Sequence, residues 1–502
     1  MTSPPQSNNT EKDVLSSDRS LSTDSLEINS KLEKQAVRML DYTIVPVMTM
    51  FYFLSFLASL KFLSRISQGN ARVAGLQADL GLSDHQYQIC VTVLYVPYIC
   101  AELPSNLLLR KIGPKYLMPT LLTIWGVIVT LQGLVSSYAG LVVLRAVLGL
   151  VEGPMFPGIV LYLSGFYTRE ELSLRIALFF SSASLSGAFS GLLAAAIQNM
   201  DGIGGKAGWA WIFILEGLFS VLMGVAGFFL VPSTPRDSKF LTREQKEIIM
   251  RRLERDRPSI VPQDSFSLEE IYKSLSSIHV ILVFIIFFML GTTLYGLALF
   301  LPSIVKQLGF SSTKSQLLSV GPFAAGFFLT LLFAYVSDKY RVRAIPTILI
   351  TILSVAGWSM YLATERTFVA YGSMYLTVPG VYASAPVISA WMANNSEPYY
   401  RRATSVAVGF VATNAGGILS TWRFPTKEGP HFTKTTIMNL VFAILTIVLS
   451  ILNALILHRK NVAKRRRRNV LLAPYTEDKR SDGGIRAWME LGDEHPDFIY
   501  SL

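Results

Sequence analysis

Charged side chains are scarce in this sequence of 502 residues. Lys, Arg, Asp and Glu together make up 16% of it, whereas hydrophobic residues make up 51% and the mean hydropathy is +0.42. A water-soluble domain of this composition would expose more apolar surface than soluble proteins tolerate. Uncharged runs such as ILVFIIFFMLGTTLYGLALFL, residues 281–301, are long enough to cross the roughly 30 Å hydrocarbon core of a bilayer. The sequence therefore predicts a polytopic membrane protein.

Cysteines and clustered histidines are lacking as well. The two cysteines, Cys90 and Cys100, fall within one apolar run, so no disulfide framework is expected. The five histidines are scattered without the spacing of a metal site. The sequence has no glycine-rich phosphate loop ending in Lys-Ser or Lys-Thr, which leaves ATP-driven transport without support. We therefore expect no metal, no cofactor and no enzymatic activity.

Acidic residues are outnumbered by basic ones, which gives a formal net charge of +11. The basic residues lie in short loops between apolar runs and in one run, KRRRR at 464–468. The basic loops are those around 109–117, 167–175, 338–343 and 398–402, and the loops that alternate with them carry few cations. This distribution is typical of the cytosolic side of a membrane, beside anionic lipid, and it does not indicate a nucleic-acid partner. Both termini are therefore expected in the cytosol.

Apolar runs predict about twelve transmembrane helices, each of roughly 17–25 residues. The first six are expected at about 41–63, 87–108, 116–135, 139–165, 175–198 and 209–231. The second six are expected at about 278–304, 316–337, 344–363, 368–392, 404–421 and 436–457. The predicted fold class is thus all-α, with one six-helix half at 35–231 and another at 278–457.

Three polar segments frame the two halves. Residues 1–34 are polar and rich in serine, and we expect a disordered cytosolic tail there rather than a cleaved signal peptide. Residues 232–277 are charged and helical in pattern, which predicts a cytosolic linker. Residues 458–502 are expected to form a basic cytosolic tail.

A repeated basic turn supports the division into halves. RKIGPKY (110–116) joins the second and third predicted helices of the first half, and SDKYRVR (337–343) joins those of the second half. Equivalent turns in two six-helix halves indicate duplication, which is typical of major facilitator transporters. Substrate is then expected near the membrane midplane, between halves that rock about it to give alternating access.

Two charged residues lie inside the fourth predicted helix. Arg145 and Glu152 are seven residues apart, so they share one helix face at a separation of about 10 Å. A charge at this depth costs at least about 2.5–3.5 kcal/mol, so both side chains are expected to face a cavity. Substrate movement that alters their contact would change the proton affinity of Glu152, which is a basis for proton coupling. A structural ion pair is the alternative.

Polar side chains at the end of the tenth predicted helix and within the eleventh are candidate substrate contacts. Trp391, Asn394 and Asn395 lie within about one turn of each other, although a tryptophan there is also a common interface anchor. Asn414 can both donate and accept, which suits a carboxylate or hydroxyl ligand, but it could equally bond a neighbouring helix.

The two repeated turns are assigned to a cytosolic gate. In the second turn we expect an acid–base latch that closes one side of the transporter. The predicted gating residues are Asp338, Arg341 and Arg343 in the second half and Arg110, Lys111 and Gly113 in the first half.

Several motifs together resemble the fungal allantoate/nicotinate permease branch of the anion:cation symporters, which are major facilitator proteins. They are AELPSNLLLRKIGPKY, VLGLVEGPMFPG, GWAWIFILEG, FLPSIVKQLGF, WMANNSEPYYRRA and GDEHPDFIYSL. The resemblance begins near residue 35 and implies uptake of small organic acids or vitamins, commonly with protons. It implies that Glu152 carries the proton with Arg145 as its partner, and that Asn414 contacts substrate.

The sequence departs from the family at Ala210 in GWAW, where the family usually has arginine, and the departure that matters lies at the end of the first predicted helix. FLSRISQGNA matches the family at Arg65, Gly69 and the two residues that follow, but Ser64 and Ser67 replace the family's acid and amide. The segment 58–68 also contains what looks like extra sequence, so either the acid is lost or the gene model includes a mis-spliced piece. The match places Arg65 towards the central cavity, where its planar guanidinium suits a carboxylate or phosphate.

The leading hypothesis is a monomeric secondary active transporter of a small organic anion, coupled to protons, in a fungal plasma membrane. An exporter of a secondary metabolite is the alternative, favoured by the missing acid beside Arg65. A nutrient sensor that binds without transporting is a third hypothesis. Its partners would be the substrate, the proton and the lipid bilayer.

Overall fold

The computed structural model describes residues 31–55, 76–198, 200, 202–256, 268–310, 312–423, 432–476 and 483–502. Up to the middle of the chain the helices are Lys31–Ser55, α3 (Leu76–Asp79), α4 (Asp84–Thr92), α5 (Tyr95–Ile112), α6 (Pro114–Gln132), α7 (Tyr138–Glu152), α8 (Met155–Ser164), α9 (Leu172–Gln198), η1 (Ile203–Gly205), α10 (Gly208–Leu230), η2 (Pro235–Asp237), α11 (Arg243–Asp256) and α12 (Leu268–Leu275). The later helices are α13 (Ile278–Gln307), α14 (Ser312–Tyr340), α15 (Ala344–Ala363), α16 (Thr367–Tyr382), α17 (Ser384–Asn394), α18 (Tyr399–Thr421), α19 (Thr433–Arg466), α20 (Arg468–Thr476), α21 (Gly483–Leu491) and η5 (Gly492–Glu494).

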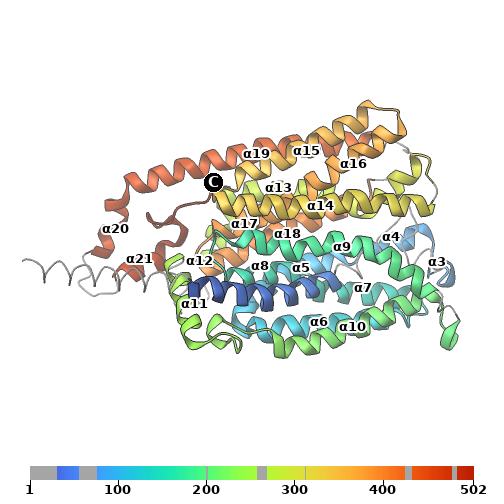
Figure 1. The fold of residues 1–502 in the computed structure, drawn as a ribbon, viewed down its shortest axis with the longest axis horizontal. Coiled ribbons are helices and arrows are strands. Elements are labelled where there is room, and N and C mark those ends of the chain that lie inside the picture. The colour runs from blue at the N-terminus through green and yellow to red at the C-terminus, as the bar shows by residue number, and fades with distance from the viewer. Residues whose placement is uncertain are drawn as a thin grey trace, which may run out of the picture.

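The predicted all-α membrane fold is confirmed. Within the described residues, ten helical stretches are long and apolar enough to cross a membrane, and none of these residues forms a β-strand. Two of the ten combine neighbouring helices, α7 with α8 and α16 with α17. Helices α5 and α9 run alongside these stretches through the bundle (Figure 1). Together they agree with the expected number of about twelve.

The helices form two groups that pack against each other. Within the first group α6 packs along α10, and within the second α15 packs along both α16 and α19. Helix α5 packs against α18, and α9 packs against α14, so these two pairs join the groups. Figure 1 shows the first group in blue and green below the second group in yellow and red. The space where the two groups meet is therefore bordered by helices from distant parts of the chain.

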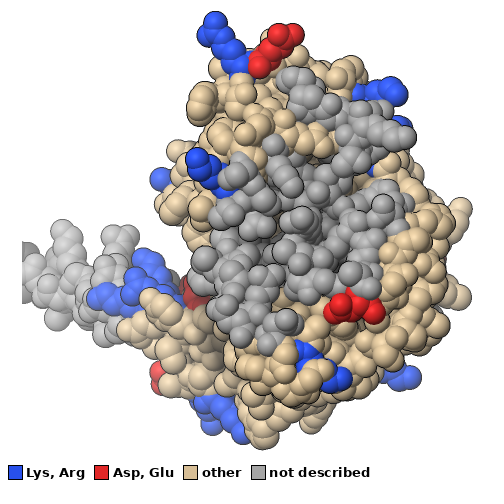
Figure 2. Space-filling model, turned by 90° about the vertical axis from the view of Figure 1, so that its right-hand side faces the viewer, with Lys and Arg blue, Asp and Glu red and all other residues tan. Residues whose placement is uncertain are grey.

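The two ends of the bundle differ in charge. Helices α11, α12, α20 and α21 gather at one end, which we call the charged end (Figure 1). The KRRRR run belongs to α19 and the start of α20, at this same end. The opposite end carries α3 and α4 and faces the viewer in Figure 2, where the charged groups of the described residues stand apart from one another.

The repeated turns have a backbone that a side chain rarely adopts. Gly113, between α5 and α6, has φ +87°, in the region that favours glycine. Pro114 follows it as the first residue of α6, where its missing N–H leaves no helical bond unmade. The corresponding turn of the second group contains Arg341 with φ +57°. A non-glycine residue in this region is strained, so its side chain is expected to have a role that offsets the strain.

Two glycines on α7 allow it to approach α5 closely. A Cβ atom on Gly149 would lie 2.2 Å from the carbonyl oxygen of Leu94, and one on Gly153 would lie 2.6 Å from that of Tyr98. Small residues at such contacts are typical of packed membrane helices. The close approach brings the start of α5 beside Glu152, the last residue of α7.

We predict that Gly149→Val destabilises the folded protein by about 1–3 kcal/mol, because the added atoms must displace the α5 backbone. The matched control is Gly158→Ala in α8, since a Cβ there meets nothing nearer than Met118 Cε at 3.8 Å. Apparent melting temperatures in detergent measure the difference. Equal melting temperatures for the two variants would contradict the packing of α7 on α5.

Candidate functional site

A cavity lies between the two helix groups, at the middle of the bundle. It leaves about 70 Å³ open to the centres of water molecules, which is room for a handful of waters. An organic substrate would need the cavity to widen. The lining comes from both helix groups: Tyr52, Ser55, Leu94, Tyr95, Tyr98, Glu152, Met155, Phe156 and Phe180 from the first, and Phe287, Leu290, Gly291, Leu294, Tyr295, Ala385, Ser389, Phe410, Thr413 and Asn414 from the second.

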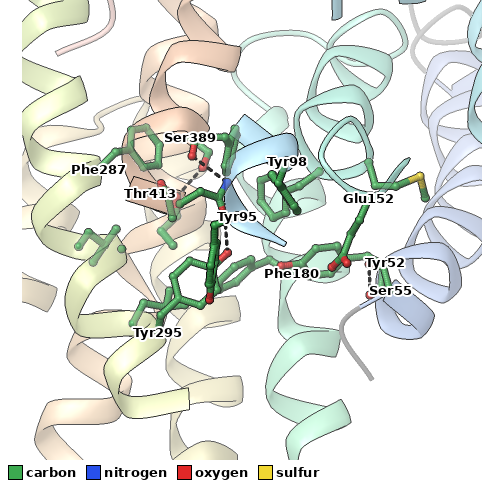
Figure 3. Close-up of a pocket in the computed structure, with 18 of the residues that line it drawn as sticks. Tyr52, Ser55, Tyr95, Tyr98, Glu152, Phe180, Phe287, Tyr295, Ser389 and Thr413 are labelled. Atoms are coloured by element: carbon green, nitrogen blue, oxygen red, sulfur yellow. Dashed lines mark hydrogen bonds between the residues drawn. The ribbon is translucent and has the colours of Figure 1, made fainter. Parts of the chain in front are cut away.

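Aromatic rings make up much of the wall and touch across the interface (Figure 3). Phe156 of α8 packs against Phe410 of α18 with ring centroids 4.3 Å apart. Tyr95 of α5 meets Tyr295 of α13 edge to face at 5.9 Å. Ring contacts of this kind are worth about 0.5–1.5 kcal/mol each beyond their buried area. A flat, ring-bearing ligand suits such a wall.

Glu152 projects into the cavity from the end of α7 (Figure 3). It is 8% exposed, and Arg145 on the same buried face of α7 is 1% exposed. The sequence thus located two buried charges on one helix face, but only the acid reaches the cavity lining. Among the described lining residues Glu152 is the only acid, and none is Lys or Arg.

Asn414 lines the cavity and connects the two helix groups. Its Nδ2 donates to Glu102 Oε1 of α5 at 2.8 Å and to the Phe410 carbonyl at 2.9 Å, and its Oδ1 accepts from the Tyr295 hydroxyl at 3.0 Å. The two alternatives left open by the sequence, substrate contact and helix-to-helix bonding, therefore meet in one side chain. In this arrangement its amide already has partners at both ends.

Sequence reasoning missed Glu102 and the tyrosines of the wall. Glu102 is an acid inside an apolar run, which is the same feature that indicates Glu152. In the sequence, however, Glu102 contributes only to the motif AELPSNLLLRKIGPKY that carries the family resemblance. Tyr95 and Tyr98 stand in the same run, and a tyrosine in an apolar helix gives no indication of whether it faces a cavity or lipid.

Trp391, Asn394 and Asn395 lie at the charged end and line no part of the central cavity. Trp391 Nε1 donates to the Ser501 carbonyl at 2.9 Å, and Asn395 exchanges two bonds with the Ser501 backbone, at 3.0 Å and 2.7 Å. Asn394 Nδ2 donates to the Arg169 carbonyl at 2.8 Å. The side chains of all three predicted substrate contacts therefore form hydrogen bonds to backbone atoms at the charged end, where α17 ends.

The predicted gate residues of the second half contact the first half. Asp338 Oδ2 accepts from the Leu174 backbone N–H at 2.7 Å, and Arg343 Nη2 donates to the Arg169 carbonyl at 2.7 Å. Arg343 also pairs with Asp338 at 2.5 Å. The strained Arg341 pairs with Glu170 at 2.9 Å. These contacts close the charged end of the bundle over the segment that leads into α9.

The predicted gate residues of the first half make fewer contacts. Lys111 is exposed beside the Gly113 turn and has no hydrogen bond or ion pair to any described residue. The side chain of Arg110 lies outside the described part of the chain, and so does all of Arg65, the predicted substrate-binding arginine. Among the described side chains, the contacts that these turns make between the two helix groups therefore come from the second turn.

Residues 492–502, which we call the clasp, lie across the closed gate. The Tyr500 backbone exchanges two bonds with the Asn461 side chain of α19, at 3.0 Å and 2.9 Å. The Phe498 ring packs under the Arg169 guanidinium of the first group, at 4.6 Å from its centroid. Phe498 and Tyr500 are buried. The clasp therefore contacts both groups at once.

Asp493 fixes the start of the clasp in a buried site. Its carboxylate pairs with Arg401 of α18, and its backbone N–H donates to the Glu397 carbonyl at 3.1 Å. Burial raises the pKa of Asp493 to about 7, with Glu494 adding to the rise, while Arg401 and Lys464 oppose it. The carboxyl of Asp493 can therefore change its charge near neutral pH.

Comparison with known proteins bears on this arrangement. A family model described as Major Facilitator Superfamily matches residues 44–421. An uncharacterised transporter of Schizosaccharomyces pombe is 33% identical, over 85% of this chain and 84% of that protein. A high-affinity nicotinic acid transporter of Saccharomyces cerevisiae is 30% identical, over 93% of this chain and 85% of that protein. The solved structure of the proton:xylose symporter XylE superposes with a TM-score of 0.61 at 16% identity, covering 83% of this chain and 95% of that chain.

We predict that the clasp loosens as the pH rises. The pKa of Asp493 is about 7 when the clasp is docked and has its ordinary value near 3.8 when it is free, so the docked form holds the proton more tightly. This contribution to docking is complete below the ordinary pKa and is lost as the pH rises through about 7. Burial lowers the pKa of Lys464, which donates to the Asp493 and Phe498 carbonyls, to about 7, so its deprotonation favours docking as the pH rises above that value. A spin label on Ile499→Cys, an exposed clasp position, should therefore become more mobile between pH 4.5 and 6.5, where Asp493 dominates.

The matched control is Asp493→Asn, which keeps the size of the side chain and cannot ionise. Its label should remain immobile over the same range. A pH response equal to that of the parent would show that another group loosens the clasp.

Proposed function

The chain belongs to the major facilitator superfamily and is a multi-pass membrane transporter rather than an enzyme, and we propose that it carries a small, ring-bearing organic anion together with protons. The supporting observation is the aromatic cavity between the two helix groups, with Glu152 as its one described acid. Substrate would bind there, and alternating access would follow from rocking of residues 35–231 against residues 278–457.

The nature of the wall supports a flat substrate. Rings from both groups line the cavity and would enclose a ligand ring on two sides. The similar yeast protein is named for nicotinic acid, which is a pyridine carboxylic acid. We propose a substrate of this chemical class, an aromatic monocarboxylate, with Arg65 as the cation that receives its carboxylate.

The charge of the cavity supports proton coupling. An anion placed beside an ionised Glu152 would be repelled, because no described lining residue is a cation. The anion binds more favourably when Glu152 carries a proton, because the neutral carboxyl does not repel it, so the binding of substrate and the binding of the proton assist each other. Arg145, two turns earlier on α7, would hold the charge of Glu152 after the substrate and proton have left.

The charged end is proposed to face the cytosol, because cytosolic loops carry an excess of Lys and Arg. The closed contacts of Arg343, Asp338 and Arg341 would then be the cytosolic gate, and the clasp would lie on its inner surface. The arrangement described here would be one in which substrate cannot leave toward the cytosol.

The same cavity supports a second candidate, an exporter of a ring-bearing cation. A cation would bind an ionised Glu152 and would be expelled when a proton takes its place, which is exchange rather than symport. The absence of Lys and Arg among the described lining residues is the observation that favours it. The two candidates predict opposite pH dependences of substrate binding. An anion would bind more tightly as the pH falls, and a cation would bind more tightly as the pH rises.

The proposed orientation predicts the reactivity of introduced cysteines. In a background without Cys90 and Cys100, Ser136→Cys between α6 and α7 should react with an impermeant maleimide on intact cells. Lys239→Cys at the charged end should react only after the cells are opened. Both positions are exposed in the structure, so burial does not separate them. Labelling of Lys239→Cys on intact cells would reverse the orientation.

For transport, we predict that protein in proteoliposomes accumulates labelled nicotinate when the inside is alkaline. Glu152→Gln should abolish accumulation, because a neutral amide cannot carry the proton, while equilibrium exchange of substrate continues. Accumulation by Glu152→Gln equal to that of the wild type would remove Glu152 from the coupling. Uptake that is driven instead by an acidic interior, with a ring-bearing cation as substrate, would favour the exporter.

A further inference from the structure

Glu102 is the most completely buried of the described acidic residues, with 0% of its surface exposed. It lies on α5, and its Oε1 accepts from Asn414 Nδ2 of α18 at 2.8 Å. Its second oxygen, Oε2, has no hydrogen-bond partner among the described residues. This buried carboxyl is therefore held by one amide donor, and that donor belongs to the opposite helix group.

The position of Glu102 is immediately behind the cavity wall. Asn414 separates it from the cavity, and Tyr98, one turn earlier on α5, lines the cavity itself. A ligand that draws Asn414 towards itself would weaken the bond to Glu102, since Phe410, Tyr295 and Glu102 already occupy the amide. Substrate and Glu102 can thus affect each other through one side chain.

No described residue forms an ion pair with the Glu102 carboxyl. The titratable side chains that face Glu102 are Tyr98 of its own helix and Tyr295 of α13, with Glu152 of α7 across the cavity. Arg145 is the buried cation of α7, and it makes no ion pair with Glu102. An ionised Glu102 would be a buried charge with a single amide donor, which is strongly unfavourable. The neutral carboxyl is the form that fits this arrangement.

The contact between α5 and α18 decides whether water reaches Glu102. Both helices run to the charged end, where α5 meets the Gly113 turn and α18 carries Arg401. At 1.5 Å per residue, Glu102 lies about 15 Å from the end of α5, and Asn414 about 20 Å from Arg401 along α18. We call the contact between α5 and α18 the seam. If the two helix groups part at the charged end, the seam opens first at the surface and then as far as Glu102.

We propose that Glu102 is a proton-release group of this transporter: it holds a proton while α5 and α18 are closed, and it gives up that proton to water when the seam opens. Asn414 is then a positioning residue that fixes the carboxyl in the closed arrangement. The inference rests on the proposed function in one respect, since the proton released at this seam is the one that accompanies substrate.

Protonation of Glu102 and opening of the contact between α5 and α18 are thermodynamically linked. The closed seam binds the proton more tightly than the open seam, so a rising pH must favour opening. Between the two proton affinities, one titrating group changes the ratio of open to closed molecules by up to about tenfold per pH unit. Glu152 meets the substrate, while Glu102 would respond to the opening itself.

The test measures the opening directly and needs no substrate. Spin labels on Lys239→Cys and Lys339→Cys, exposed positions at the charged end of the first and second groups, report the distance between the groups. The background lacks Cys90 and Cys100 and carries Asp493→Asn and Lys464→Gln, so that neither titratable group with a pKa of about 7 at the clasp contributes its own titration. The parent should show a rising fraction of long distances between pH 5.5 and 8.5.

Two variants separate titration from bonding. Glu102→Gln keeps an acceptor for Asn414 but cannot ionise, so its distances should stay short and should not change with pH. Asn414→Ala removes the bond but leaves the carboxyl, so its distances should still change with pH. Glu216→Gln changes another buried acid that does not line the cavity, and it should respond like the parent because it leaves Glu102 intact.

The outcomes are distinct. A pH response in Glu102→Gln equal to that of the parent, or a parent that does not respond, overturns the assignment of Glu102. A flat response in Asn414→Ala overturns it as well, since it would make the bond rather than the proton the cause. Failure of the wild type to accumulate substrate in a pH gradient would overturn the proposed function, and it would be seen in a separate experiment.

Discussion

Arg343 is a buried residue that joins the two helix groups and the clasp at the charged end. It is 1% exposed, and its guanidinium donates to Asp338 and Ser337 of its own helix group and to the Arg169 carbonyl of the other. Its backbone N–H donates to the Leu502 carbonyl of the clasp. Its Nη1 and Nη2 groups have these partners, whereas its buried Nε has none among the described residues. Removing one partner of a buried pair typically costs about 3–5 kcal/mol. Parting the groups would take the Arg169 carbonyl away from Arg343, so another acceptor or water must replace it.

The contacts between the groups differ in kind along the bundle, and this difference decides what movement requires. At the cavity the groups touch through rings such as Phe156 and Phe410, whose packing has broad geometric tolerance. At the charged end they meet through directional bonds of Arg343 and Asp338 that cannot slide. The Glu102–Asn414 bond lies between these zones. In the proposed rocking of the two helix groups, the aromatic rings at the cavity can shift by small amounts. Opening the charged end would instead require the hydrogen bonds of Arg343 and Asp338 to the first group to break.

The sequence predicted the helices and turns well, and it predicted the contact partners of individual side chains poorly. Apolar length and basic turns gave the helix count, the two halves and the turn at Asp338, because these depend on composition over many residues. Arg145 and Glu152 were recognised because charge is rare in an apolar helix. Trp391 and the amides after it were expected near substrate, but their partners come from residues 169 and 501, which no local pattern indicates. Glu102 shows the same limit, since Asn414 is 312 positions away.

The two basic turns share a backbone conformation with positive φ but differ in the residue that adopts it. Both need a residue with positive φ, and the first uses Gly113, for which this backbone is unstrained. The second uses Arg341, which accepts backbone strain and places its guanidinium on Glu170 of the other group. A glycine at 341 would relieve the strain and remove the ion pair, while an arginine at 113 would add strain. Among the described side chains, the second turn therefore contacts the first helix group through Arg341, whereas Gly113 in the first turn joins α5 to α6.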